Sequence, residues 1–301
     1  MSGSLRIARL FGIDIRAHVT FVLLLGLAAL DFGQSGGARG AVFGVLLVLA
    51  LFGCITLHEL GHSLVARRFG AVVREIVLLP IGGVARLQRE PQSPFAELLT
   101  ALAGPLVNVV IALGLGALWV ARVGKLPEPA HLAEHLARPT PDTFLLWLMA
   151  SNGLLAVFNM LPALPMDGGR VLRALLSFFV GRARATTIAA GVGQALALGL
   201  IAFGLLARPP QLILTLIGLF VFFAAGQERR AVRASDALRE LKAGEVCHPA
   251  AEALGPSDDL GDAVDHALRT GQSVFPVLYG KDLIGVVLRD EVLMAAGKLG
   301  L

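Results

Sequence analysis

Six apolar stretches alternate with polar and basic connections along most of the chain. A helix needs about 20 apolar residues to cross the hydrocarbon core of a membrane. The stretches that approach or exceed this length are Ala17–Phe32, Val42–Val65, Phe95–Val120, Phe144–Leu161, Thr186–Ala207 and Leu212–Ala225. The pattern predicts a polytopic α-helical membrane protein with about six transmembrane helices. An even number of spans would place both ends of the chain on one side of the membrane.

The composition agrees with a protein that lies in a lipid bilayer. Hydrophobic residues make up 55% of the 301 residues and charged residues only 16%, whereas a soluble domain carries about 25% charged residues. The mean hydropathy is +0.74. The net charge of +4 would suit a nucleic-acid partner, but the arginines gather beside the apolar stretches, as loop charges of membrane proteins do. We therefore expect no nucleic acid as a partner.

The arginines also predict the orientation. Connections on the cytoplasmic side of a membrane protein carry an excess of Lys and Arg. In a six-span arrangement, the four basic segments fall on one face: Arg6, Arg9 and Arg16; Arg67, Arg68, Arg74, Arg86 and Arg89; Arg170, Arg173, Arg182 and Arg184; Arg229, Arg230 and Arg233. We expect a multi-pass protein of a prokaryotic cell (inner or plasma) membrane with both termini cytoplasmic.

The second apolar stretch contains the sequence HELGH, with His58, Glu59 and His62. Residues four apart share one face of a helix, so the two imidazoles can bind one metal ion. Glu59 is rotated from them by roughly 100° and can take a proton from water beside the ion. The alternative is a pair of histidines satisfied by neighbouring helices. An apolar span weakens that alternative, because lipid supplies no polar partners.

A third ligand is needed, because a catalytic zinc usually binds three protein groups and leaves one position open. Asp167 is the best candidate, in the sequence NMLPALPMDGGR at the end of the fourth span. Its prolines and glycines interrupt the helix and allow the carboxylate to turn inward; the alternative is a turn aspartate in a cytoplasmic loop. Cys54, one turn before His58, is expected to be a packing residue and not a ligand.

Three separated motifs, HELGH, AGPLVN (Ala103 to Asn108) and NMLPALPMDGG, together resemble the site-2 proteases, the intramembrane zinc metalloproteases of peptidase family M50. The resemblance covers roughly residues 1–230. It implies one Zn²⁺ per chain, bound by His58, His62 and Asp167, with Glu59 as the general base. It also implies that Asn108 lies near the metal and assists the substrate or the transition state. From the residues alone, Asn108 is only a polar residue in an apolar third span, and hydrogen bonding in the core would explain it.

The same resemblance implies a metalloendopeptidase that cleaves membrane-anchored proteins near the cytoplasmic face, in regulated intramembrane proteolysis. The stretch EIVLLPIGGVARL, residues 75–87, is β-rich, and the family suggests a small membrane-associated β element there. A strand edge can bind an unwound peptide through main-chain hydrogen bonds. Gly82 and Gly83 are therefore candidate substrate-binding residues, and a simple cytoplasmic hairpin remains the alternative.

Residues 231–301 have a different composition and predict a linker helix followed by a small cytoplasmic α/β module. A helix is expected over 260–270, and the sequences SVFPVL and LIGVVL predict two strands joined by the turn YGKD. The module resembles a single CBS motif. Such motifs work in pairs, so it is either half of a truncated pair or it forms a homodimer. The resemblance implies an adenine nucleotide, but Leu288 and Glu291 stand where the family has Thr and Asp, which puts nucleotide binding in doubt.

Two other classes of function remain open. An ion transporter or channel regulated by a CBS module can also contain an intramembrane metal site. Such a protein does not need Glu59 at that spacing, so the glutamate favours the protease. An inactive scaffold is the third hypothesis, against which the intact set of His58, Glu59, His62 and Asp167 argues. The apolar spans exclude a soluble metalloprotease.

Overall fold

The computed structural model describes residues 3–80, 82–89, 93–125, 139–240, 242, 245 and 252–299. The chain divides into two compact units, Met1–Asp236 and Ala237–Leu301. In the residues that the structure describes, the first unit contains a helical bundle and a four-stranded sheet, and the second contains a β-hairpin with a helix before it and a helix after it.

Five helices in the described part of the chain are long and apolar enough to cross a membrane. They are α1 (Phe21–Arg68), α2 (Pro94–Val123), α4 (Pro141–Asn159), α6 (Arg182–Leu206) and α7 (Leu212–Glu240). These helices contain the predicted apolar stretches almost completely; Ala17 and His18 instead belong to a strand. The first two predicted spans both lie in α1. The count of six crossings and the side on which the termini lie stay predictions.

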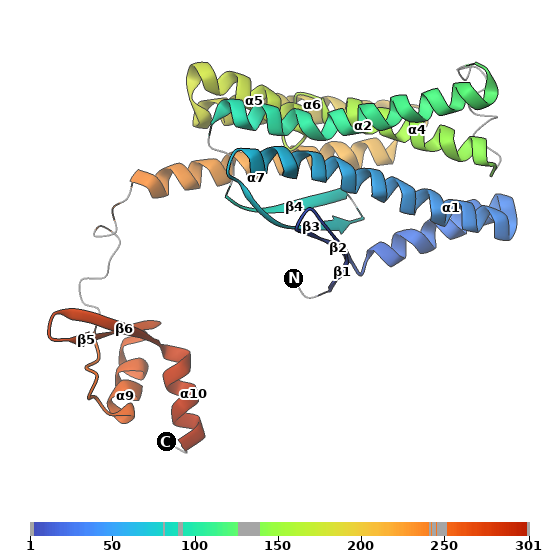
Figure 1. Cartoon of the computed structure of the whole chain (residues 1–301). Helices are drawn as coiled ribbons and strands as arrows, with labels where there is room; N and C mark the ends of the chain where they lie inside the picture. Colours follow the sequence, from blue (N-terminus) through green and yellow to red (C-terminus); the bar gives the residue numbers. More distant parts are fainter. Residues whose placement is uncertain are drawn as a thin grey trace. The chain divides into compact units, whose positions relative to one another are not determined.

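Helix α1 reverses direction within its length. Gly37 has φ 58° and ψ −147°, a backbone conformation that favours glycine because it has no Cβ. The segments on either side of it pack against each other: the rings of Phe21 and Phe52 are 4.5 Å apart, and those of Phe32 and Phe43 are 5.5 Å apart. Figure 1 shows this turn in blue, at the right-hand end of the bundle. α1 is therefore a helical hairpin.

A four-stranded sheet packs on α1. Its strands are β1 (Ser4–Leu10), β2 (Ile13–His18), β3 (Val72–Leu79) and β4 (Gly82–Arg89). They lie in the order β1-β2-β3-β4, and only β2 and β3 are parallel. Ile13 and Ile76 of the sheet share a buried cluster with Phe52 and Leu60 of α1. The β-rich stretch at residues 75–87 thus forms β3 and β4, and β4 lies at an edge of the sheet.

The N-terminal strands β1 and β2 are not anticipated from the sequence, which suggests only a polar and basic segment. The alternation of apolar and charged residues is nevertheless present: Ile13 and Ile15 are buried, and Arg16 reaches back to Ser4. β2 and β3, which precede and follow α1 in the sequence, pair in parallel. The sheet therefore ties the N-terminus to the end of the helix that carries the histidines.

Helix α5 (Asp167–Val180) follows α4 and precedes α6 in the sequence. It packs against α2 and α6. The sequence suggests only a basic connection here. Arg173, one of its basic residues, is 3% exposed and pairs with Glu97 and Glu228. The interpretation of Arg173 as a loop charge is therefore wrong, because a helix turns it toward two carboxylates that the sequence does not show to be nearby.

The C-terminal unit contains α9 (Leu260–Thr270), β5 (Val274–Tyr279), β6 (Asp282–Leu288) and α10 (Arg289–Leu299). The helix and the two strands lie where the sequence predicts them, and β5 and β6 form an antiparallel hairpin. Leu254, Phe275 and Val292 are in its core. Its identity as a CBS motif stays a prediction.

Candidate metal centre

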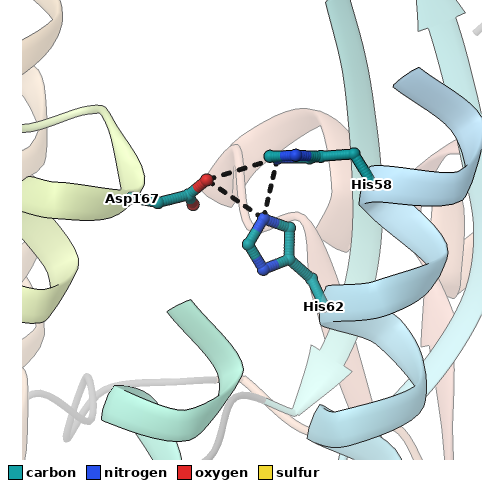
Figure 2. A group of neighbouring side chains, drawn as sticks. All are labelled: His58, His62 and Asp167. Atoms are coloured by element: carbon teal, nitrogen blue, oxygen red, sulfur yellow. Dashed lines mark hydrogen bonds and ion pairs between the residues drawn. The ribbon is translucent and has the colours of Figure 1, made fainter. Parts of the chain in front are cut away.

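Three side chains from two helices meet in the interior of the first unit. His58 and His62 lie on one face of α1, and Asp167 is the first residue of α5. The Nε2 atoms of the two histidines are 3.0 Å apart, and Asp167 Oδ2 is 3.2 Å from each of them. All three residues are less than 9% exposed. Figure 2 shows the carboxylate pointing at both imidazoles from the opposite helix.

The spacing of these atoms fits a tetrahedral metal ion. Ligand atoms about 2.0–2.1 Å from a tetrahedral zinc lie roughly 3.3–3.4 Å from each other. The three observed separations, 3.0, 3.2 and 3.2 Å, are close to that value. Two nitrogens and one carboxylate oxygen are also a ligand set that catalytic zinc uses. The arrangement is therefore suited to zinc.

The outer nitrogens of the two imidazoles are both occupied by residues of α2. His62 Nδ1 lies 2.7 Å from the carbonyl oxygen of Thr100. A carbonyl only accepts hydrogen bonds, so Nδ1 donates and Nε2 keeps its lone pair. His58 Nδ1 donates in the same way to Oδ1 of Asn108. Metal-binding histidines usually have such a partner, which fixes the ring and its tautomer. Both Nε2 lone pairs are therefore available to a metal.

Two backbone segments pack unusually closely against each other around Asp167. A Cβ on Gly168 would lie 2.3 Å from the carbonyl oxygen of Met160, and one on Gly169 would lie 2.3 Å from the amide of Leu164. The two glycines thus let the turn after α4 fold against the start of α5. Asp167 is in the first turn of α5, where the helix dipole favours a negative charge. This explains why the sequence DGG directs the carboxylate inward.

Helix α2 approaches the histidines through its backbone. A Cβ on Gly104 would lie 2.2 Å from His62 Nε2 and 2.7 Å from His58 Nε2. Any other residue at position 104 would therefore occupy the space in which the imidazole nitrogens meet. Asn108, one turn further along α2, is 0% exposed and contacts His58 from the far side of the ring.

Glu59 is half-buried on α1 and lies against the sheet. A Cβ on Gly83 of β4 would be 2.6 Å from Glu59 Cγ, so the backbone of the edge strand touches this side chain. Gly82, the preceding residue, has φ +137°, which disfavours residues other than glycine. Of the two predicted substrate-binding glycines, Gly83 thus lies beside the predicted general base, whereas a Cβ on Gly82 would meet nothing within 4 Å. Cys54 packs with Phe43 and Leu47.

Two features escape the sequence. Asn152 of α4 is 0% exposed and accepts a hydrogen bond from Asn108 at 2.8 Å; its only signal is a polar residue in an apolar span. The other is the pairing of Arg173 with Glu97 and Glu228. Burial by itself would lower the pKa of Arg173, but the two carboxylates outweigh it and raise the pKa above its ordinary value.

Comparisons with known proteins identify relatives of this arrangement. The model of peptidase family M50 matches residues 46–203. The chain is 35% identical over 291 residues to a zinc metalloprotease of Methanocaldococcus jannaschii, and the alignment covers 95% of this chain and 78% of that protein. A solved site-2 protease from Methanocaldococcus jannaschii matches with a TM-score of 0.53 and 38% identity, over 75% of this chain and 95% of that one.

Proposed function

The chain belongs to peptidase family M50 and is an intramembrane zinc metalloprotease, and we propose that it cleaves membrane-anchored proteins close to the cytoplasmic face, in regulated intramembrane proteolysis. The observation that carries this proposal is the convergence of His58, His62 and Asp167, directly beside Glu59 on the same helix. In this assignment the three residues bind the zinc and Glu59 is the general base.

The residues around the site have different roles in peptide hydrolysis. When bound, zinc supplies a Lewis acid that polarises a carbonyl group and makes a neighbouring water more acidic. Glu59 accepts the proton of the attacking water and passes it to the amine that leaves. Its side chain lies against Gly83, so the strand backbone limits the positions that the carboxylate can take. The three ligands are less than 9% exposed, which limits the access of other water to the reacting groups.

The edge strand β4 is the proposed substrate-binding surface. A peptide bond within a helix is shielded by the helix itself, so the substrate must unwind before cleavage. An unwound segment can pair with an exposed strand edge through main-chain hydrogen bonds. β4 is the last strand of the sheet, and its Gly83 touches Glu59. A substrate strand beside β4 would therefore pass close to the general base.

The position of the site along α1 supports cleavage near one membrane face. His62 lies about 9 Å along the helix axis from Arg68, at 1.5 Å per residue, and Arg67 and Arg68 end the helix. Basic residues at a helix end favour the cytoplasmic side. We infer from this that both termini are cytoplasmic. Labelling of single cysteines introduced at Gly3 and Asp258 in intact and opened cells tests the orientation; labelling of either one in intact cells contradicts it.

Replacing Glu59 by Gln tests the proposed reaction. Membrane-protein fragments are compared between cells that carry the wild-type protein and cells that carry Glu59→Gln, and zinc is measured in the purified proteins. We expect the cleaved fragments to disappear while zinc content stays near one per chain. The matched control is Glu75→Gln on β3, which changes a carboxylate paired with Arg16 of β2. This variant should still cleave. Fragments that persist with Glu59→Gln would contradict the assigned mechanism.

The rival function of a metal-containing transporter makes a different prediction. Transport does not require a general base at position 59, so Glu59→Gln would leave ion flux in proteoliposomes unchanged. A flux that requires His58 and Asp167 but not Glu59, without cleavage of any membrane protein, would favour the transporter.

For the C-terminal unit we propose self-association. Its hairpin exposes large apolar side chains, among them Leu283, Ile284 and Val286. A second copy could cover this face. Glu291, which stands at a nucleotide-contacting position of CBS motifs, accepts a hydrogen bond from the backbone of Leu288, so we do not propose nucleotide binding. Mass measurement of the purified protein with Ile284→Asp should show loss of a dimer; an unchanged dimer, or a wild-type monomer, contradicts the proposal.

A further inference from the structure

The Nδ1 atoms of the two histidines donate hydrogen bonds to chemically different partners. His62 donates to a backbone carbonyl, that of Thr100. His58 donates to a side chain, Oδ1 of Asn108. A backbone carbonyl remains whatever the side chain at position 100 is, whereas the partner of His58 is lost with a single substitution. The orientation of His58 therefore depends on the identity of residue 108.

The partner of His58 is itself fixed by a row of hydrogen bonds. Asn108 Nδ2 donates to Oδ1 of Asn152 at 2.8 Å, and Asn152 Nδ2 donates to the carbonyl oxygen of Leu148 at 2.8 Å. Because the last acceptor is a backbone carbonyl, every donor and acceptor in the row is determined. Both asparagines are 0% exposed, and an amide flipped in this interior would lose its partners at a cost of about 1–3 kcal/mol.

This row decides which nitrogen of His58 faces the other ligands. If Asn108 presents Oδ1, His58 carries its proton on Nδ1 and its Nε2 lone pair points toward Asp167. If the amide were reversed, its N–H would face Nδ1, and the proton of His58 would have to move to Nε2. Asn152 prevents the reversal, because its Oδ1 is an acceptor and would then face the oxygen of Asn108, which has no hydrogen to donate. Asn152 of α4 thus acts on His58 of α1 through Asn108 of α2.

We propose that Asn108 and Asn152 are positioning residues that hold His58 in its metal-binding tautomer and orientation, and that they act through His58 and not on the substrate. The proposal rests on the assignment of His58, His62 and Asp167 as the zinc ligands. It differs from a role of Asn108 at the transition state, because both groups of its amide are engaged away from the reacting peptide: Oδ1 with His58 and Nδ2 with Asn152.

The test is the zinc affinity of the whole 301-residue chain, measured by competition with a zinc chelator. Asn108→Leu removes the acceptor with little change in volume, and we expect roughly 10–100-fold weaker zinc binding, the range found for partners of metal ligands. Asn108→Asp keeps an oxygen that accepts from His58 Nδ1, but its second oxygen faces Oδ1 of Asn152, so the hydrogen bond between residues 108 and 152 is lost. Its zinc affinity should therefore lie between that of the wild type and that of Asn108→Leu. Asn152→Leu should give a smaller loss than Asn108→Leu.

The matched control is Thr186→Val on α6, which removes a buried hydroxyl that donates to the backbone carbonyl of Arg182 in its own helix. It should leave zinc affinity unchanged. Thermal unfolding of the zinc-free proteins identifies any variant that fails to fold, and Asn152→Leu then replaces Asn108→Leu as the decisive variant. A folded Asn108→Leu or Asn152→Leu protein with wild-type zinc affinity overturns the proposal. If Asn108→Leu instead lowers kcat alone, the residue acts at the transition state.

The ligand assignment is checked separately with His58→Ala. If that variant still binds one zinc with wild-type affinity, the assignment of the metal site fails. If His58→Ala loses zinc while both asparagine variants keep it, only the positioning role fails. The two failures are therefore distinguishable.

Discussion

Two buried polar clusters both include residues of α2 and α5, and they differ in how their charges are balanced. In the metal centre, His58, His62 and Asp167 all direct lone pairs at one point, and residues of α2 accept hydrogen bonds from the outer nitrogens of the two histidines. In the second cluster, Arg173 of α5 places Nε and one terminal nitrogen 2.6 Å from Glu97 of α2, and the other 2.5 Å from Glu228 of α7.

The difference separates a site for chemistry from a site for stability. The guanidinium of Arg173 is itself the cation that the carboxylates need, so the cluster is complete within the protein. The metal centre brings together acceptors that repel one another, and a bound cation relieves that repulsion. Substitutions should therefore affect catalysis and zinc binding at the first cluster, and the free energy of unfolding at the second.

The largest effect is expected from Asp167→Asn. The substitution preserves size but removes the charge and one strong oxygen ligand, so zinc binding should weaken more than about 100-fold and cleavage should fall below detection. Zinc content and cleavage of a membrane-anchored substrate are the measurements. Asp142→Asn, which changes a half-exposed carboxylate paired with Arg122, is the control and should behave as wild type. A zinc-replete Asp167→Asn protein would argue against this ligand.

Arg173→Met should have the next largest effect, on stability. It leaves Glu97 buried without a partner, and breaking one side of a buried pair costs about 3–5 kcal/mol. The melting temperature in detergent should fall, while the folded fraction still binds zinc with wild-type affinity. Arg122→Met, at an exposed pair, should cost less than about 1 kcal/mol. Loss of zinc binding without loss of stability would contradict the separation of the two clusters.

Combining Arg173→Met with Glu97→Met should restore much of the lost stability. Apolar residues of similar volume often replace a buried ion pair with little cost. We expect the double variant to recover at least about half of the loss caused by Arg173→Met, giving a favourable coupling energy in a double-mutant cycle. If the two losses simply add, Glu97 and Arg173 do not stabilise the protein as a pair.

Glu228→Gln should have the smallest effect. The Glu228 side chain is 39% exposed, against 7% for Glu97, and exposed pairs contribute about 0–1 kcal/mol. The melting temperature should therefore change much less than with Glu97→Gln. An equal fall with both variants would mean that Glu228 is as tightly held in solution as Glu97.

Much of the fold follows from local sequence patterns. Apolar length predicts the helices that can cross a membrane, and the turn YGKD predicts the β5–β6 hairpin. Local patterns give only a weak signal for β1 and β2, although Ile13 and Ile15 alternate with Asp14 and Arg16, because the strands are short and surrounded by basic residues. They do not reveal the burial of Arg173, because it depends on carboxylates 76 and 55 positions away in the chain.

The sequence by itself determined the pair His58 and His62, because a spacing of four residues on a helix fixes their common face. It also determined the apolar setting and, with the glycines after it, the candidacy of Asp167. Only the tertiary structure decided that Asp167 meets histidines 105 and 109 positions away, that Asn108 faces His58, and that Asn152 fixes Asn108. The physical reason is that helical periodicity specifies which residues share a face, whereas packing between helices specifies which faces meet.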